Sequence, residues 1–156
     1  MPIIDEDRLA RNIARAQAYF DRHGKAFRPH IKTHKIVALA RRQIAAGAVG
    51  INCQKIAEAE VFADGGIGDI LITYNIMGPE KLGRLRALHE RVQTLTMTAD
   101  NAAVVQGLAA SFDAARPLRV LVDATPAPGD AASSPRPMRW PLPRRSMPRR
   151  GWPSWG

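Results

Sequence analysis

Residues 49–74 read VGINCQKIAEAEVFADGGIGDILITY and contain a strand, a helix and a second strand in one run. VGINC is typical of a strand, KIAEAEVFADGG of a helix that its glycines close, and DILITY of a fully buried apolar strand. Two strands joined through a helix pair side by side in parallel, with a right-handed crossover. This stretch therefore predicts an α/β fold built on a parallel sheet.

The same alternation of strands and helices extends in both directions along the chain. Helices are predicted over 5–24, 35–47, 78–92 and 100–115, and strands over 26–32, 94–98 and 118–123. Pro29 weakens the first strand, Asp100 is the expected N-cap of the last helix, and LRVLVD at 118–123 is expected to be buried. About five such units indicate a doubly wound sheet or part of a (β/α)8 barrel, whose complete form needs about 250 residues.

The charge is distributed unevenly between the body of the chain and its last residues. Residues 124–156 hold six Arg and one acid, which accounts for +5 of the net +9, together with eight of the 12 Pro and all three Trp. They show no helical or strand period and are predicted to be a disordered tail. The first 123 residues carry only +4, so we expect no nucleic-acid partner despite the high pI.

Other features exclude several classes of protein. No apolar run approaches the roughly 20 residues needed to span a bilayer, and no signal peptide begins the chain. The single Cys53 cannot form an internal disulfide, is too little for a cysteine metal site, and is expected to be a small buried residue. We therefore expect a cytoplasmic protein with no membrane partner.

The segment RPHIKTHK at 28–35 concentrates basic chemistry where the first predicted strand ends. In parallel α/β folds the functional residues lie at the carboxyl ends of the strands. A lysine there can act as an amine nucleophile, although three cations can equally solvate a loop. The residues at predicted strand ends are Lys32, Cys53, Gln54, Tyr74, Asn75, Thr98, Asp100 and Asp123.

RPHIKTHK, together with GAVGINCQKIAEAEVFADGGIGDILITYNI at 47–76, resembles the D-threonine aldolase and D-serine dehydratase-like family. The resemblance covers about residues 3–123. It implies a partial alanine racemase-type barrel over 1–123 that binds pyridoxal 5'-phosphate. It also implies that Lys32, the lysine directly after PHx, forms the Schiff base with the cofactor and then acts as acid or base. Lys35 is expected at the start of the next helix, facing solvent.

The resemblance implies a lyase that cleaves D-threonine-like D-3-hydroxy amino acids by a retro-aldol reaction. A D-serine or 3-hydroxyaspartate dehydratase, an amino-acid racemase of the same fold and an inactive truncated remnant are the alternatives. The parent enzyme is expected to be a homo-oligomer, with a divalent metal site in a C-terminal domain that this chain lacks.

Four further residues are candidates for cofactor contact. If residues 26–32 form a strand, His30 and Lys32 point to the same side, and His30 orients the cofactor or fills the barrel floor. Gln54, Tyr74 and Asn75 line the pocket or cap strand ends. His30 and His34 have the i, i+4 spacing of a metal pair, but a strand-to-helix break separates them, so we expect no metal site in this chain.

The sequence departs from the family after the last predicted strand. In the family that strand is followed by a segment close to CDTGxGRCGVQSP, whereas residues 124–140 read ATPAPGDAASSPRPMRW. We wrote the tail in GC-rich codons and assumed that one base was lost at the codon for Asp123. Translation of the neighbouring reading frame then gives CDTGAGRCGVQSP, followed by a segment with an LALA helix. We therefore interpret residues 124–156 as an out-of-frame translation.

Overall fold

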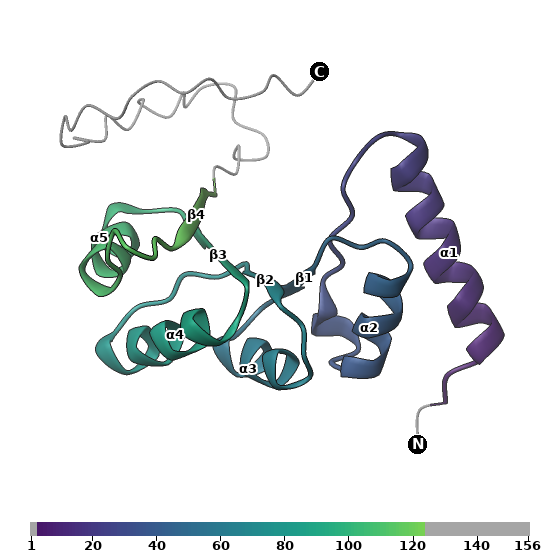
Figure 1. Ribbon diagram of the computed structural model, residues 1–156, viewed down its shortest axis with the longest axis horizontal. Helices are drawn as coiled ribbons and strands as arrows, with labels where there is room; N and C mark the ends of the chain where they lie inside the picture. The colour runs from purple at the N-terminus through teal and green to yellow at the C-terminus, as the bar shows by residue number, and fades with distance from the viewer. Residues whose placement is uncertain (1–2, 124–156) are drawn as a thin grey trace, which may run out of the picture. The chain divides into compact units, whose positions relative to one another are not determined.

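The computed structural model describes residues 3–123, which lie in one compact unit (Figure 1). Its helices are α1 (Glu6–Arg22), α2 (Val37–Ala45), α3 (Ile56–Asp64), α4 (Pro79–Arg91) and α5 (Ala102–Ser111), with a 3₁₀ turn at Ile31–Thr33. Its strands are β1 (Ile51–Cys53), β2 (Asp69–Ile72), β3 (Thr94–Ala99) and β4 (Arg119–Val122). The tail predicted from residue 124 onward lies outside the described residues. No helix within residues 3–123 is long and apolar enough to cross a membrane.

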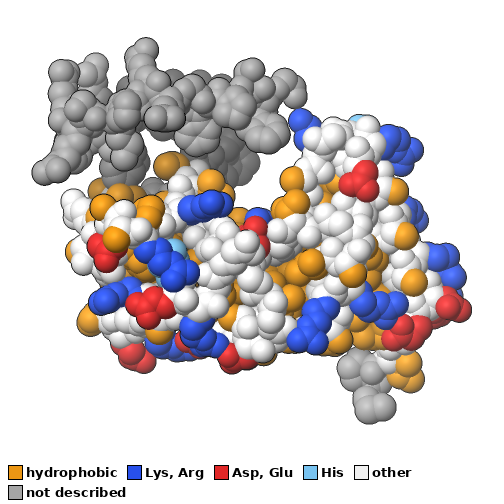
Figure 2. All heavy atoms as spheres, in the orientation of Figure 1, with side chains coloured by type: hydrophobic (Ala, Val, Ile, Leu, Met, Phe, Trp, Pro, Cys, Tyr) orange, Lys and Arg blue, Asp and Glu red, His pale blue; other side chains and the backbone are white. Residues whose placement is uncertain are grey.

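The four strands form one sheet in the order β1-β2-β3-β4, with every neighbouring pair parallel. From β1 to β4 strands and helices alternate, and α3 and α4 lie on the same side of the sheet (Figure 1). The predicted α/β fold with a parallel sheet is therefore confirmed. On the face of the molecule shown in Figure 2, basic and acidic side chains are interspersed over the described part of the chain.

The hydrophobic core lies between the sheet and its helices. In β1, β2 and β3 every second residue is buried against them, whereas the residues between are half-buried. The prediction that DILITY is buried on both faces is therefore wrong, because Leu71 faces a side of the sheet that no helix of the described part covers. The buried core side chains of the strands and helices include Ala40, Ile51, Cys53, Ile56, Ala59, Phe62, Ile70, Ile72, Leu85, Leu88, Leu95, Met97, Val104 and Leu108.

The strand predicted at 26–32 is reduced to a single β-bridge between His30 and Asn52. The segment still runs along β1, because the Pro29 carbonyl accepts a hydrogen bond from the Asn52 amide at 2.8 Å. Pro29 itself has no N–H to donate, and the chain turns into the 3₁₀ helix at Ile31 directly afterwards. The described sheet therefore has four strands and a bridge rather than five strands.

Two further sequence predictions are wrong in detail. The residue that caps α5 is Asn101, whose side chain accepts the Val104 amide at 3.1 Å; Asp100 instead accepts hydrogen bonds from the Asn75 and Asn101 side chains. Strand β4, predicted as buried, is exposed along its whole length. Within residues 3–123 it has a strand on one side only and no helix after it to cover its apolar face.

Candidate active site

His30 is held in one orientation at the carboxyl ends of the strands. Its Nδ1 accepts the Lys32 amide hydrogen at 3.2 Å, so the neutral ring carries its proton on Nε2. Nε2 lies 3.3 Å from the Thr73 hydroxyl, which in turn donates to the Cys53 carbonyl at 3.3 Å. Burial, followed by the charge of Lys32, lowers the pKa of His30 below its ordinary value, although Gln54 and Glu58 oppose the shift. The ring is therefore a neutral donor to Thr73.

Lys32 lies in the 3₁₀ helix and not on a strand, so the strand geometry that predicted a shared side with His30 is wrong. The two residues are linked instead through the Lys32 amide and the His30 ring. The Lys32 side chain is exposed, and it forms no ion pair with any residue from 3 to 123. Its amine is thus available to a ligand.

Lys35 is exposed to solvent, as predicted, but it does not belong to the helix that follows. It lies in the loop before α2 with a φ of 53°, and its Nζ contacts the Glu58 carboxylate at 3.0 Å. Glu58 also accepts the Gln54 amide at 2.9 Å. Burial alone would raise the pKa of Glu58, but the hydrogen bonds from Gln54 and Lys35 outweigh it and lower the pKa. Lys35 is therefore tied to α3, which leaves Lys32 as the lysine of this segment without an acidic partner.

The three remaining candidates line a separate cleft. Gln54, Tyr74 and Asn75 border a space of about 470 Å³ between the starts of α3 and α4, together with Lys55, Ile56, Ala57, Ile76, Lys81 and Arg84. Neither His30 nor Lys32 lines this cleft. Only Gln54 connects the two places, because it also interacts with the His30 ring. The structure therefore divides the predicted site residues into two neighbouring groups.

The structure also shows the surroundings of Cys53 and His34. Cys53 is fully buried, and burial followed by the nearby Glu58 raises the pKa of its thiol to about 12, so the thiol stays protonated. Its prediction as a small buried residue is confirmed. The His34 ring accepts the Ile36 amide at 3.0 Å through Nδ1. Within residues 3–123 no three His, Cys, Asp or Glu side chains are grouped as metal ligands.

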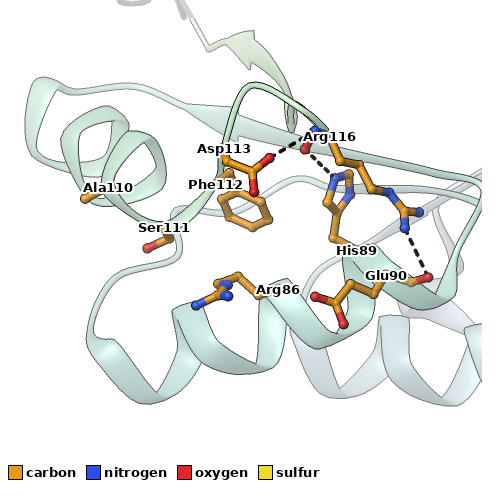
Figure 3. Close-up of a pocket in the computed structure, with 8 residues that line it drawn as sticks. All are labelled: Arg86, His89, Glu90, Ala110, Ser111, Phe112, Asp113 and Arg116. Carbon is orange, nitrogen blue, oxygen red and sulfur yellow. Dashed lines mark hydrogen bonds between the residues drawn. The ribbon is translucent and has the colours of Figure 1, made fainter.

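A further pocket of about 310 Å³ lies at the opposite end of the sheet, where the chain turns from α5 into β4 (Figure 3). No sequence pattern singled out its buried His89, which follows the buried Leu85 and Leu88 on α4. The His89 Nε2 lies 3.2 Å from the Arg116 carbonyl oxygen. The His89 and Phe112 rings pack edge-on, with their centroids 5.4 Å apart (Figure 3). These contacts fix the α5–β4 turn, which is a structural role.

Sequence reasoning missed Thr73 and Glu58. Thr73 directly precedes the strand-end pair Tyr74 and Asn75, so its position at the carboxyl end of β2 was a usable signal. Glu58 lies four residues after Gln54, a spacing that brings a side chain back to the start of its own helix. Its partner Lys35 is 23 positions away in the chain and was not predictable from local spacing.

Comparisons with known proteins identify the family of the chain. The family described as "Alanine racemase, N-terminal domain" matches residues 4–124. The chain is 44% identical over 100 residues to a D-threonine aldolase from Arthrobacter sp., which covers 64% of this chain and 26% of that protein. It is 43% identical over 108 residues to a D-threo-3-hydroxyaspartate dehydratase from Delftia sp. (strain HT23), covering 69% and 28%.

A solved structure shows the same architecture. The crystal structure of D-threonine aldolase from Filomicrobium marinum matches with a TM-score of 0.75 and 35% identity, over 79% of this chain and 33% of that one. The chain thus spans between a quarter and a third of the length of these relatives.

Proposed function

Because the chain belongs to the alanine racemase N-terminal domain family, we propose that it is the N-terminal part of a pyridoxal-phosphate-dependent lyase for D-3-hydroxy amino acids. The observation that carries this proposal is the Lys32 amine. It is exposed at the carboxyl end of the sheet, it has no acidic partner among residues 3–123, and its backbone is bonded to a neutral His30.

The described residues fit such a cofactor. When bound, pyridoxal phosphate supplies an aldehyde that a lysine amine can attach to and a ring that takes up electrons from the substrate Cα. A lysine already paired with a carboxylate, as Lys35 is with Glu58, would have to lose that partner first. The Lys32 amine can react without first breaking an ion pair, because no described acid bonds to it.

The residues around Lys32 have separate tasks in this proposal. The Lys32 amine holds the cofactor and then accepts or returns a proton beside the substrate Cα. His30 positions the Lys32 backbone and, because it is neutral, places no positive charge against the amine. Thr73 fixes the His30 ring from the other side.

The reaction we propose first is retro-aldol cleavage of a D-threonine-like substrate, which breaks the Cα–Cβ bond. Loss of the 3-hydroxyl group by dehydration is the second candidate, and the similarity to the Delftia dehydratase favours it. Both reactions use the same lysine and differ in which bond is cleaved. We expect the 156-residue chain to be a weak or inactive catalyst, since it spans only part of its relatives.

The test is covalent capture of the cofactor. The 156-residue chain is incubated with pyridoxal phosphate, reduced with borohydride and mapped by mass spectrometry. We expect the adduct on Lys32, its near-complete loss in Lys32→Ala, and its retention in the matched control Lys35→Ala. An adduct centred on Lys35 or Lys55, with Lys32 unmodified, contradicts the proposal.

A further inference from the structure

Two of the lysines that line the cleft between the starts of α3 and α4 form no salt bridge within residues 3–123. Lys55 precedes α3 and Lys81 lies in the first turn of α4, and both line the same space of about 470 Å³. Neither forms an ion pair with any residue from 3 to 123. Both lysines therefore line one cleft, and neither is held in a salt bridge by a described acid.

Arg84, the third cation that lines the cleft, is already paired, although the charge of Glu80 in the first turn of α4 also acts on it. The Arg84 guanidinium donates one hydrogen bond to each carboxylate oxygen of Glu60, with N···O distances of 3.0 and 2.5 Å. This pairing lowers the pKa of Glu60. Glu58 is the acid close to Lys55, but it is bonded to Lys35. Residues 124–156 hold a single acid against six Arg, so their composition offers little to balance the lysines.

The backbone adds to this positive character. Neither α3 nor α4 has a side chain that caps its first N–H groups, because Lys55 and Gly78 occupy the N-cap positions. By contrast, α1 and α5 are capped by Asp5 and Asn101. Free N–H groups and the helix dipole both favour an anion at such ends.

The remaining walls of the cleft are mostly apolar. Ile56, Ala57 and Ile76 line it, and the Tyr74 side chain borders it with 60% of its surface exposed. A cavity of this size falls in the range that holds small organic ligands. The walls therefore suit a ligand with an apolar or aromatic body, not a bare inorganic ion.

We propose that this cleft binds a small organic anion, a carboxylate or a phosphate attached to an apolar or aromatic body. The site is separate from the one proposed for the cofactor, since neither Lys32 nor His30 lines it. The pocket in Figure 3 lacks this character: it contains two acids as well as two arginines, and the Arg116 guanidinium is bonded to backbone carbonyls.

The test is isothermal titration of the 156-residue chain with phenyl phosphate and, in a second arm, phenylacetate. The neutral benzyl alcohol is the ligand control. Lys55→Gln and Lys81→Gln each remove one charge at similar size, and each should raise the Kd about tenfold, as expected for one charge-assisted hydrogen bond. Lys55→Arg should recover most of the affinity, and Lys25→Gln, on the loop after α1, should leave it unchanged.

The two anion arms identify the ligand group, because the tighter of the two shows whether phosphate or carboxylate fits better. Lys32→Ala should bind phenyl phosphate as the unmodified chain does, which separates this site from the cofactor site. Wild-type affinity in both glutamine variants, equal binding of benzyl alcohol, or an equal loss in Lys25→Gln overturns the proposal. Thermal melting of each variant confirms that a lost signal is not unfolding.

Discussion

Arg28 shows how one residue of the basic segment serves structure rather than catalysis. Its guanidinium contacts both carboxylate oxygens of Asp69, at 2.9 and 3.1 Å, and lies over Gly50. This ion pair joins the segment before the 3₁₀ helix to the start of β2, and so holds His30 and Lys32 at the sheet. The Arg28 guanidinium occupies the space that a side chain at position 50 would fill, so this ion pair requires glycine there.

We predict that Gly50→Ala lowers the free energy of unfolding by about 1–3 kcal/mol. The added methyl group would meet the Arg28 guanidinium and lie 2.6 Å from the Asp69 carbonyl oxygen, which is backbone and cannot move aside easily. Urea denaturation followed by circular dichroism measures the change.

Gly83→Ala is the matched control for this substitution. Position 83 lies inside α4 with no atom within 4 Å of the added methyl group, so alanine should raise stability by up to about 1 kcal/mol. Equal stability of the Gly50→Ala variant and the unmodified chain would show that Arg28 does not pack as described.

Strand β4 illustrates how an element can form while its sequence pattern is misleading. Its residues pair with β3, with Val120 opposite Met97 and Val122 opposite Ala99. Met97 and Ala99 are buried under helices, but Val120 and Val122 are 39% and 69% exposed because no described helix covers them. Among residues 3–123 no strand pairs with the second edge of β4, and an apolar strand with an unpaired edge favours pairing with another chain.

We predict that the 156-residue chain self-associates through β4 and that Val122→Lys weakens this association by about tenfold. The lysine removes apolar contact surface and adds like charges that repel each other across the edge. Sedimentation velocity over a concentration series measures the effect. Val61→Lys, at a valine of α3 that is 55% exposed, is the control and should associate as the unmodified chain does.

At the scale of the whole molecule, the pKa shifts predict an acid-sensitive fold. Burial lowers the pKa of His30 and of His34, and hydrogen bonds lower those of Glu58 and Glu60. A group whose pKa is lower in the folded chain binds more protons when unfolded, so stability falls as the pH drops below the ordinary value. For the histidines this loss begins near pH 6.5, and for the carboxylates near pH 4.5.

We therefore expect the melting temperature to be lower at pH 5.5 than at pH 7.5, through the histidines. The double substitution His30→Asn and His34→Asn should reduce this difference, because asparagine keeps an acceptor and does not titrate. His23→Asn, at the exposed end of α1, is the control. A melting temperature that rises on acidification contradicts the histidine assignment.

The interpretation of residues 124–156 as an out-of-frame translation is also a statement about the whole molecule, and it lies outside the described residues. Resequencing the locus tests it. Family sequence in the neighbouring reading frame supports the interpretation, and its absence from every frame rejects it.

The order of the elements and the parallel type of the sheet follow from local sequence patterns alone. The helical periods of Leu9 to Phe20 and of Leu82 to Val92, and the glycine stops, are local signals that do not depend on the rest of the chain. Lys32 was also selected at this stage, through the resemblance of RPHIKTHK to a known family. These predictions depend on neighbours a few positions apart, and such neighbours act in any fold.

The tertiary structure decided what depends on distant neighbours. Whether β2 and β4 are buried depends on which helices cover them, and whether Lys35 is free depends on Glu58, 23 positions away. Gln54, Tyr74 and Asn75 line a cleft that Lys32 does not line, because the cleft lies where α3 and α4 begin. Burial, ion pairing and cavity lining are properties of several chain segments together, and no local sequence pattern contains them.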